Sequence, residues 1–261
     1  MKPFLMTLLQ TMLFAYLLLA LSFWLLADSV LFQPPKHPNS LYLSIDIPLA
    51  NQQTLSAVYL PNPKARYTIL FSHGNAEDLF FIYPFLQMLN QQGFAVFAYD
   101  YPGYGKSPGK ASEANTYKAI NAAYDYVTDE LRVPPSNIIV YGRSVGTGPS
   151  IELATHRQVG GLILESPFVS AFRVYTRWPL FPFDIFQNLS KIPNVKAPIL
   201  LIHGTHDSVI PLWHGQKIYD AIQSPKQALW VDGASHNNVL AVSDKSYWQA
   251  IQHFAASLNK D

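Results

Sequence analysis

A serine, an aspartate and a histidine each follow an apolar run of this chain. Ser144 is the centre of Gly-Arg-Ser-Val-Gly at 142–146, directly after the apolar run 138–141. A serine hydroxyl is a poor nucleophile near neutral pH, and it needs a histidine to take its proton as it attacks a carbonyl. The histidine needs a carboxylate to fix its tautomer and to stabilise the imidazolium. Asp207 and His236, which follow later apolar runs, are the candidates for these two roles.

The two glycines that flank the serine predict a sharp turn from a strand into a helix. Side chains at Gly142 and Gly146 would crowd such a turn, and glycine has none. A turn of this kind projects the hydroxyl of Ser144 above the sheet, where a substrate can reach it.

Short apolar runs alternate with amphipathic segments along most of the chain. An antiparallel hairpin is predicted at 41–47 and 54–60, followed by strands at 67–72, 94–99, 137–141, 161–165, 199–203 and 227–231. Helices are predicted at 79–91, 112–131, from the serine turn to about 157, 212–223 and 244–258. This alternation predicts an α/β fold with a mostly parallel sheet covered by helices on both faces. Active sites in such sheets lie beyond the carboxyl ends of the strands, which is where the three candidate residues fall.

Five motifs occur in an order that resembles the α/β-hydrolase superfamily. They are His-Gly-Asn-Ala at 73–76, Asp-Tyr-Pro-Gly-Tyr-Gly at 100–105, Gly-Arg-Ser-Val-Gly at 142–146, His-Gly-Thr-His-Asp at 203–207 and Gly-Ala-Ser-His-Asn-Asn at 233–238. They most resemble the branch with an H-G-N-A motif and a serine aminopeptidase-like profile, which includes membrane-anchored proteins and protein depalmitoylases. The resemblance covers about 41–258. Pro102 and Ser235 depart from the arginine and glycine common in that branch, and neither is a triad position.

The resemblance implies a role for each of five site residues. Ser144 is the nucleophile, His236 the general base and Asp207 the acid that orients it, in the chain order of the family. The loop that holds the H-G-N-A motif supplies one oxyanion donor, and the residue after the nucleophile supplies the other. These donors are the backbone N–H groups of Asn75 and Val145.

Two residues compete with the assigned acid and base. Glu165 also comes at the end of a predicted strand and is the rival acid. His206 is the next candidate for the base, but it lies beside the acid, in the wrong chain order for this family.

No metal and no cofactor is expected. His203, His206 and Asp207, with a distant His73, could be interpreted as a metal cluster, but their spacing is loose and no H-E-x-x-H motif occurs. The chain has no cysteine, which excludes thiolate metal sites, disulfides and a cysteine nucleophile. The net charge is +1 with no basic stripe, so nucleic-acid binding has no electrostatic support.

The N-terminal segment is long and apolar enough to cross a membrane. From Pro3 to Ala27 there are 25 residues without a charge. A helix of that length spans about 37 Å, against a hydrocarbon core of about 30 Å. A cleaved signal peptide is the alternative, although its apolar core is usually shorter and 25–27 is a poor cleavage site. We therefore predict a single-pass membrane protein, with an anchor and the start of a linker at 1–32 and a catalytic domain at 33–261.

The positive charge at the N-terminus predicts on which side of the membrane the catalytic domain lies. Lys2 and the α-amino group favour a cytoplasmic N-terminus. The catalytic domain is then expected on the other side, in a periplasm or a lumen.

An aromatic insertion at about 166–197 interrupts the alternation of strands and helices. Phe168, Phe172 and Trp178 are candidates for an apolar wall that binds an acyl chain, or for a surface that rests on the bilayer. The alternative is an aromatic helix and loop that simply pack on the core.

Taken together, these residues predict a serine hydrolase that cleaves a carboxylic ester, thioester or lipid ester through an acyl-enzyme. A serine peptidase for short peptides is the first alternative, because the same triad serves amides. A non-catalytic binding module on a hydrolase fold is the second, and the intact set of serine, histidine and aspartate argues against it.

Overall fold

The computed structural model describes residues 2–35, 44–49 and 54–258. The strands are β1 (Ile45–Pro48), β2 (Thr54–Leu60), β3 (Thr68–Ser72), β4 (Ala95–Tyr99), β5 (Ile138–Arg143), β6 (Gly161–Glu165), β7 (Ile199–Gly204) and β8 (Lys226–Val231). The helices are α1 (Lys2–Leu31), α2 (Leu79–Gln91), α3 (Glu113–Asp125), α4 (Thr147–His156), α5 (Ala171–Tyr175), α6 (Asn188–Lys191), α7 (Trp213–Ala221), α8 (Val239–Ser243) and α9 (Lys245–Ser257).

The strands form one sheet in the order β1-β2-β4-β3-β5-β6-β7-β8. The pairs β1–β2 and β2–β4 are antiparallel, and every later pair is parallel. The prediction of a mostly parallel sheet is confirmed, and so is the antiparallel pairing of the early hairpin over its described residues. Residues 41–43 of the first predicted strand lie outside them.

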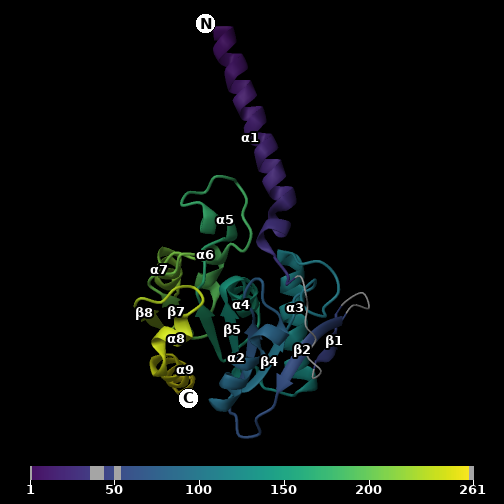
Figure 1. Cartoon of the computed structure of the whole chain (residues 1–261), viewed down its shortest axis with the longest axis vertical. Helices are drawn as coiled ribbons and strands as arrows, with labels where there is room; N and C mark the ends of the chain where they lie inside the picture. Colours follow the sequence, from purple (N-terminus) through teal and green to yellow (C-terminus); the bar gives the residue numbers. More distant parts are fainter. Residues whose placement is uncertain (1, 36–43, 50–53, 259–261) are drawn as a thin grey trace.

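Two apolar cores lie on the two faces of the sheet. One packs α3, α4 and α7 against the sheet, and the other packs α2 and α9 against the opposite face (Figure 1). The central strands β3, β5 and β7 contribute side chains to both cores, which is why they read as continuous apolar runs.

Capping side chains mark the starts of α2 and α3, and the helix predicted at 112–131 does not stay regular to its end. Asp78 accepts from the N–H of Phe81 at 2.8 Å and begins α2, while Ser112 accepts from Asn115 at 3.1 Å and begins α3. The helix predicted at 112–131 is regular only as far as Asp125, and the chain continues as a wider helical turn over Tyr126–Glu130.

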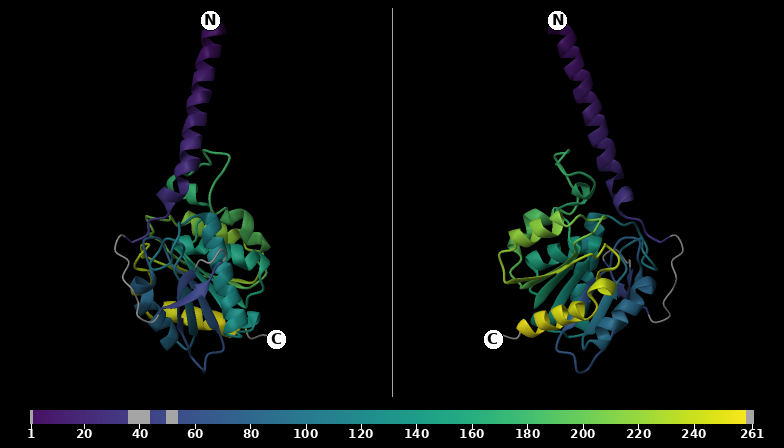
Figure 2. Two further views of the ribbon diagram at one scale, coloured as in Figure 1. Left: turned by 90° about the vertical axis from the view of Figure 1, so that its right-hand side faces the viewer. Right: turned by 60° about the vertical axis from the view of Figure 1, so that its left-hand side comes forward.

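The first helix projects away from the rest of the molecule (Figures 1 and 2). It contains a candidate membrane span at Pro3–Leu31 with a mean hydropathy of 2.1, and few of the span's residues are buried. Its end is fixed to the domain by Phe32, which is buried and whose ring lies 6.0 Å from that of Phe186. The segment that contains α5 rises beside α1 in both figures.

Candidate active site

Ser144 stands on a strained turn between β5 and α4. Its φ is +54°, a left-handed conformation that side-chain-bearing residues rarely adopt. A Cβ added at Gly142 would lie 2.5 Å from the carbonyl oxygen of Gly146, and one at Gly146 would lie 2.2 Å from that of Ser72. The two flanking glycines are therefore required for the turn to close and to pack against the end of β3.

The carboxyl edge of the sheet brings Ser144, His236 and Asp207 into one hydrogen-bonded row. His236 Nε2 lies 3.0 Å from the Ser144 hydroxyl, and His236 Nδ1 lies 2.7 Å from Asp207 Oδ2. The other oxygen of Asp207 accepts from the N–H groups of Val209 at 2.9 Å and Ile210 at 2.7 Å. The carboxylate is thus held on one side by backbone donors and presents its other oxygen to the imidazole.

The electrostatics of the row keep the carboxylate charged. Burial alone would raise the pKa of Asp207, but the hydrogen bond and charge of His236 and the N–H of Ile210 hold that pKa below its usual value. An ionised carboxylate at Nδ1 favours the tautomer in which Nε2 is free to accept the serine proton.

The rival acid and base lie in other contacts. Glu165 is 5% exposed and accepts hydrogen bonds from the hydroxyls of Tyr141 and of Tyr247, the latter at 2.7 Å. His206 Nδ1 lies 3.1 Å from the hydroxyl of Thr205. The structure therefore places Asp207, and not Glu165, against the imidazole of His236.

Two of the histidines considered as metal ligands, His203 and His73, are buried within the domain. His203 is fully buried with Nε2 2.9 Å from the carbonyl oxygen of Ile210, and burial lowers its pKa. His73 is also fully buried, and burial lowers its pKa too. Over the part of the chain that the structure describes, no group of three or more histidine, cysteine or acidic side chains is placed to hold a metal ion.

The loop after β3 carries Asn75 and lies against the serine turn. Asn75 and Ser144 line the same pocket, and Val145 follows the serine directly. A Cβ added at Gly74 would lie 3.7 Å from the Cβ of Ser144. Ala76 has a φ of +55°, so this loop, like the serine turn, holds a conformation that its surroundings must enforce.

The side chain of Asn75 ties this loop to the end of α1. Its Nδ2 donates to the carbonyl oxygen of Leu31 at 2.6 Å. Its Oδ1 accepts from the N–H of Gln33 at 2.9 Å, from the hydroxyl of Tyr104 at 2.6 Å and from the N–H of the adjacent Ala76 at 3.1 Å. The sequence assigned only the backbone of Asn75, because three of the four partners of the side chain lie more than 25 positions away.

A charged pair joins the same loop to the serine turn from the other side. Glu77 Oε2 accepts from the N–H of Gly74 at 2.7 Å, and its other oxygen pairs with the guanidinium of Arg143. The guanidinium also lies over the ring of Phe85, 5.3 Å from its centroid. Arg143 therefore points off the turn and connects the serine turn to the loop after β3.

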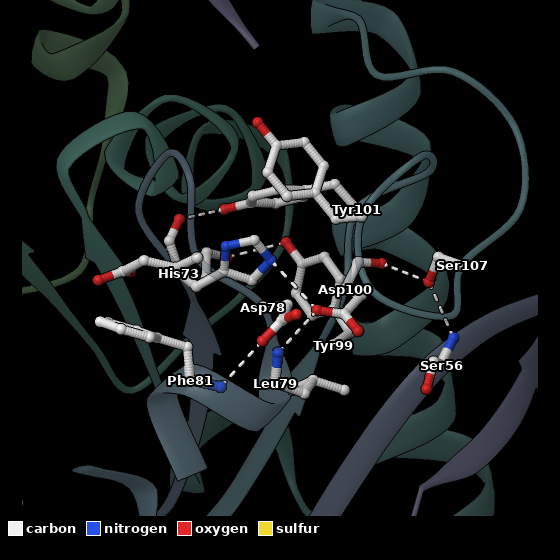
Figure 3. A network of polar contacts seen from close by, with 12 residues as sticks. Ser56, His73, Asp78, Leu79, Phe81, Tyr99, Asp100, Tyr101 and Ser107 are labelled. Atoms are coloured by element: carbon white, nitrogen blue, oxygen red, sulfur yellow. Dashed lines mark hydrogen bonds and ion pairs between the residues drawn. The ribbon is translucent and has the colours of Figure 1, made fainter. Parts of the chain in front are cut away.

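A buried polar network supports the base of the loop (Figure 3). The hydroxyl of Tyr101 donates to the carbonyl oxygen of His73 at 2.7 Å. Asp100 Oδ1 accepts from the N–H of Leu79 at 2.9 Å and lies 3.6 Å from His73 Nε2. The hydroxyl of Ser107 donates to the carbonyl oxygen of Asp100 at 2.9 Å. The motif Asp-Tyr-Pro-Gly-Tyr-Gly thus acts as a scaffold for the neighbouring loop.

A pocket of about 700 Å³ opens beside Ser144. One wall is apolar and comes from α2 and α8, with Phe81, Phe85 and Leu240 among its residues. The imidazole of His236 and residues 74–77 of the loop after β3 supply polar groups to the same pocket. The site can therefore hold an apolar group with a polar bond at one end.

The structure does not bring the predicted substrate-binding rings to this pocket. Phe168 is buried in the core against Phe186, with ring centroids 6.1 Å apart. Phe172 packs on Phe23 of α1, and Trp178 is 71% exposed. The insertion turns toward α1 because its aromatic rings find apolar partners there, and α2 supplies the apolar wall in their place.

The sequence is similar to a family model and to proteins of other organisms. A family model described as serine aminopeptidase, S33 matches residues 63–188. Alpha/beta hydrolase domain-containing protein aho-3 of Caenorhabditis elegans is 45% identical over 69% of this chain and 55% of its own length. Alpha/beta hydrolase domain-containing protein 17B of Xenopus laevis is 41% identical over 74% of this chain and 68% of its own length. The match thus spans between 55% and 68% of these two relatives.

Solved structures agree in fold. The Pyrococcus furiosus esterase Pf2001 has a TM-score of 0.74 at 17% identity, over 87% of this chain and 98% of that one. The Paleococcus ferrophilus monoacylglycerol lipase has a TM-score of 0.63 at 23% identity, over 78% of this chain and 99% of that one. At these identities the likeness concerns the fold alone, and it confirms the predicted α/β-hydrolase fold.

The buried carboxyl of Asp100 gives a pH-dependent prediction. Burial raises its pKa from 3.8 to about 7, so in this window the folded protein holds a proton that the unfolded chain releases. Stability relative to an Asp100→Asn variant should therefore fall as pH rises through the window, by up to about 1.4 kcal/mol per pH unit. Urea denaturation of both proteins in detergent at pH 4.5 and 7.5 measures this difference, and equal differences at the two pH values would contradict it.

Proposed function

Because the chain belongs to the serine hydrolases of the α/β-hydrolase superfamily, we propose that it cleaves acyl ester or thioester bonds with Ser144 as nucleophile. The observation that carries the proposal is the hydrogen-bonded row of Ser144, His236 and Asp207, with distances of 3.0 and 2.7 Å. Rows of this geometry activate a serine in unrelated folds.

The mechanism follows from the positions of these groups. Ser144 Oγ attacks the acyl carbon while His236 Nε2 takes its proton, and Asp207 stabilises the imidazolium that forms. The N–H groups of Val145 and Asn75 hold the oxyanion, and His236 then returns the proton to the leaving alcohol or thiol. Water, deprotonated by the same imidazole, releases the acyl group from the serine. We assign no cofactor or metal to any step.

The pocket favours an acyl substrate over a peptide. A peptidase for short peptides, the activity that the family model's description suggests, would use a free carboxylate to hold the peptide amine. Two acidic side chains line the pocket, and both are already engaged: Glu77 pairs with Arg143, and Glu165 accepts from two tyrosines. The apolar wall is suited to an acyl chain.

The membrane attachment is part of the same proposal. We take α1 to be a single transmembrane anchor, followed by a catalytic domain from residue 33, with the insertion 166–197 as part of that domain. Its apolar length and its largely exposed surface support this reading. The charge at Lys2 favours a cytoplasmic N-terminus and a periplasmic or luminal catalytic domain. The substrate would then be an acyl ester, thioester or lipid that reaches the membrane surface.

The nucleophile can be tested by covalent labelling. Ser144→Ala should abolish labelling by a fluorophosphonate probe while the circular dichroism spectrum stays unchanged, because the probe reacts only with an activated serine. Asp207→Asn should slow labelling by roughly 10³ to 10⁴-fold, since the imidazole loses its orienting charge. Glu165→Gln is the control for the rival acid and should label within about tenfold of the wild type. Full labelling of Ser144→Ala would refute the assignment.

The apolar wall predicts a preference for longer acyl chains. Each methylene buried contributes about 0.8 kcal/mol, so kcat/KM for p-nitrophenyl esters should rise roughly fourfold per methylene from acetyl until the wall is covered. Phe81→Ala should reduce the ratio of octanoyl to acetyl activity. Phe80→Ala is the matched control, because this neighbour on α2 is also exposed but does not line the pocket. An enzyme that prefers acetyl over octanoyl would contradict the assignment of this wall.

The side chain of Asn75 is predicted to position the oxyanion loop. Asn75→Ala removes the side-chain bonds to Leu31, Gln33, Tyr104 and Ala76, so the backbone donor should move and kcat should fall about 10- to 100-fold with little change in KM. Tyr104→Phe removes one of these four bonds and should have a smaller effect. Steady-state kinetics on a soluble ester in detergent measure both, and an unchanged kcat for Asn75→Ala would count against the positioning role.

A further inference from the structure

We propose that the tip of the aromatic insertion, Trp178–Phe183, is immersed in the lipid bilayer beside α1 and forms a second membrane attachment of the catalytic domain. The inference rests on the proposal that α1 crosses the bilayer, and it adds a second segment, far away in the sequence, to the membrane-embedded part. The partner is the hydrocarbon of the lipid itself.

The tip is in direct contact with the apolar part of α1. The hydroxyl of Tyr16 donates to the carbonyl oxygen of Leu180 at 2.9 Å. The ring of Phe181 lies 5.0 Å from that of Phe23 and 6.1 Å from that of Tyr16, measured between centroids. Both views of Figure 2 show this segment rising beside the helix. The tip thus reaches the level between Phe23 and Tyr16.

The part of that level at Tyr16 lies inside the hydrocarbon wherever the core falls within the uncharged stretch of α1. The uncharged stretch from Pro3 to Ala27 is about 37 Å long, and a hydrocarbon core of about 30 Å must fit within it. The boundary nearest the domain therefore lies between Ala27 and about Ser22. At about 1.5 Å per residue, Tyr16 is roughly 9 to 17 Å beyond this boundary. A segment that contacts both Tyr16 and Phe23 cannot stay wholly outside the lipid.

The composition of the tip fits this location. Trp178, Pro179, Leu180, Phe181, Pro182 and Phe183 are all apolar, and the nearest charges are those of Arg177 and Asp184 on either side. Trp178 is 71% exposed and Leu180 is 55% exposed. Exposed apolar side chains gathered on a projecting loop are unfavourable in water and favourable in lipid.

Some of the polar backbone groups of the segment have partners within the protein. An irregular segment enters the hydrocarbon at a lower cost where its polar backbone groups are paired. The guanidinium of Arg173 donates to the carbonyl oxygens of Thr176 and Arg177. The hydroxyl of Thr176 donates to the carbonyl oxygen of Trp178 at 3.0 Å. The carbonyl of Leu180 accepts from Tyr16, as described above. The two prolines of the tip have no N–H to satisfy.

The hydroxyls of α1 give an independent sign of the same pairing. Thr7, Thr11 and Ser22 each donate to the carbonyl four residues earlier, which satisfies a hydroxyl in lipid without any partner helix. A tyrosine hydroxyl lies too far from its own helix backbone to do so. Tyr16 is the remaining hydroxyl residue of the uncharged stretch, and its partner is the tip.

An apolar groove of about 520 Å³ lies between α1 and the insertion. Leu26 and Val30 of α1 and Tyr175 and Phe183 of the insertion are among the residues that line it. Lipid acyl chains would fill this groove when the tip is immersed. Because Asn75 also holds the end of α1, the carboxyl edge of the sheet, and with it Ser144, is fixed facing the bilayer.

Single cysteines test the proposal, since the chain has none of its own. Full-length Leu180→Cys, Leu13→Cys and Lys64→Cys variants are labelled with an environment-sensitive fluorophore and reconstituted into phosphatidylcholine vesicles. Leu13 is in the middle of α1, and Lys64 is exposed before β3, at the opposite edge of the sheet. We expect blue-shifted emission at 180 and at 13, quenched several-fold by lipids spin-labelled on the acyl chain. Emission at 64 should stay unquenched.

The three positions separate the possible failures. Quenching at 13 with a water-like signal at 180 overturns the immersion of the tip and leaves the anchor in place. A water-like signal at both positions overturns the anchor and, with it, this inference. Circular dichroism of each variant excludes misfolding as the cause. Because the cysteine at 180 keeps the backbone carbonyl, the bond from Tyr16 is retained in the tested protein.

Discussion

The contact between the serine turn and the end of β3 is the constraint on which the rest of the site depends. Gly146 approaches the carbonyl oxygen of Ser72 so closely that no side chain can stand at this position. Because β3 and β5 are parallel neighbours, their carboxyl ends bring Ser144 and the loop after β3 together at one edge. Arg143 and Glu77 then join the two loops by a charged pair, and the position of each loop depends on the other.

The strained conformations at this edge are held by buried polar contacts. Ser144 and Ala76 both have a positive φ, which costs roughly 1–3 kcal/mol each. Tyr101 and Asp100 support the loop after β3 from below, at the cost of a carboxyl buried among aromatic rings. Such an arrangement is expected of a site that keeps its donors in place before the substrate arrives, because donors that need not reorganise stabilise a transition state most.

Much of this architecture could be predicted from the sequence, and the missing parts share one physical cause. Strands β3, β5 and β7 are buried on both faces, so their apolar runs predicted the ends of these strands to within one or two residues. The order of serine, aspartate and histidine along the chain predicted the hydrogen-bonded row of these residues, because each of them follows the end of a strand. The side-chain contacts of Asn75 and the direction of the insertion were missed. Both depend on where α1 meets the domain, and no periodicity or spacing rule encodes a contact between segments so far apart in the chain.

The end of α1 is therefore more than a tether. A flexible linker would leave the domain free to rotate above the bilayer, with Ser144 facing lipid only part of the time. Here Phe32 is buried in the core and Leu31 and Gln33 bond to Asn75, so the end of the helix is bonded directly to the loop after β3. The acyl substrate proposed above would have its chain in the lipid and its ester or thioester near the surface. In the proposed arrangement, a carboxyl edge fixed toward the membrane would present Ser144 to that bond without first extracting the whole chain into water, which would cost about 0.8 kcal/mol per methylene.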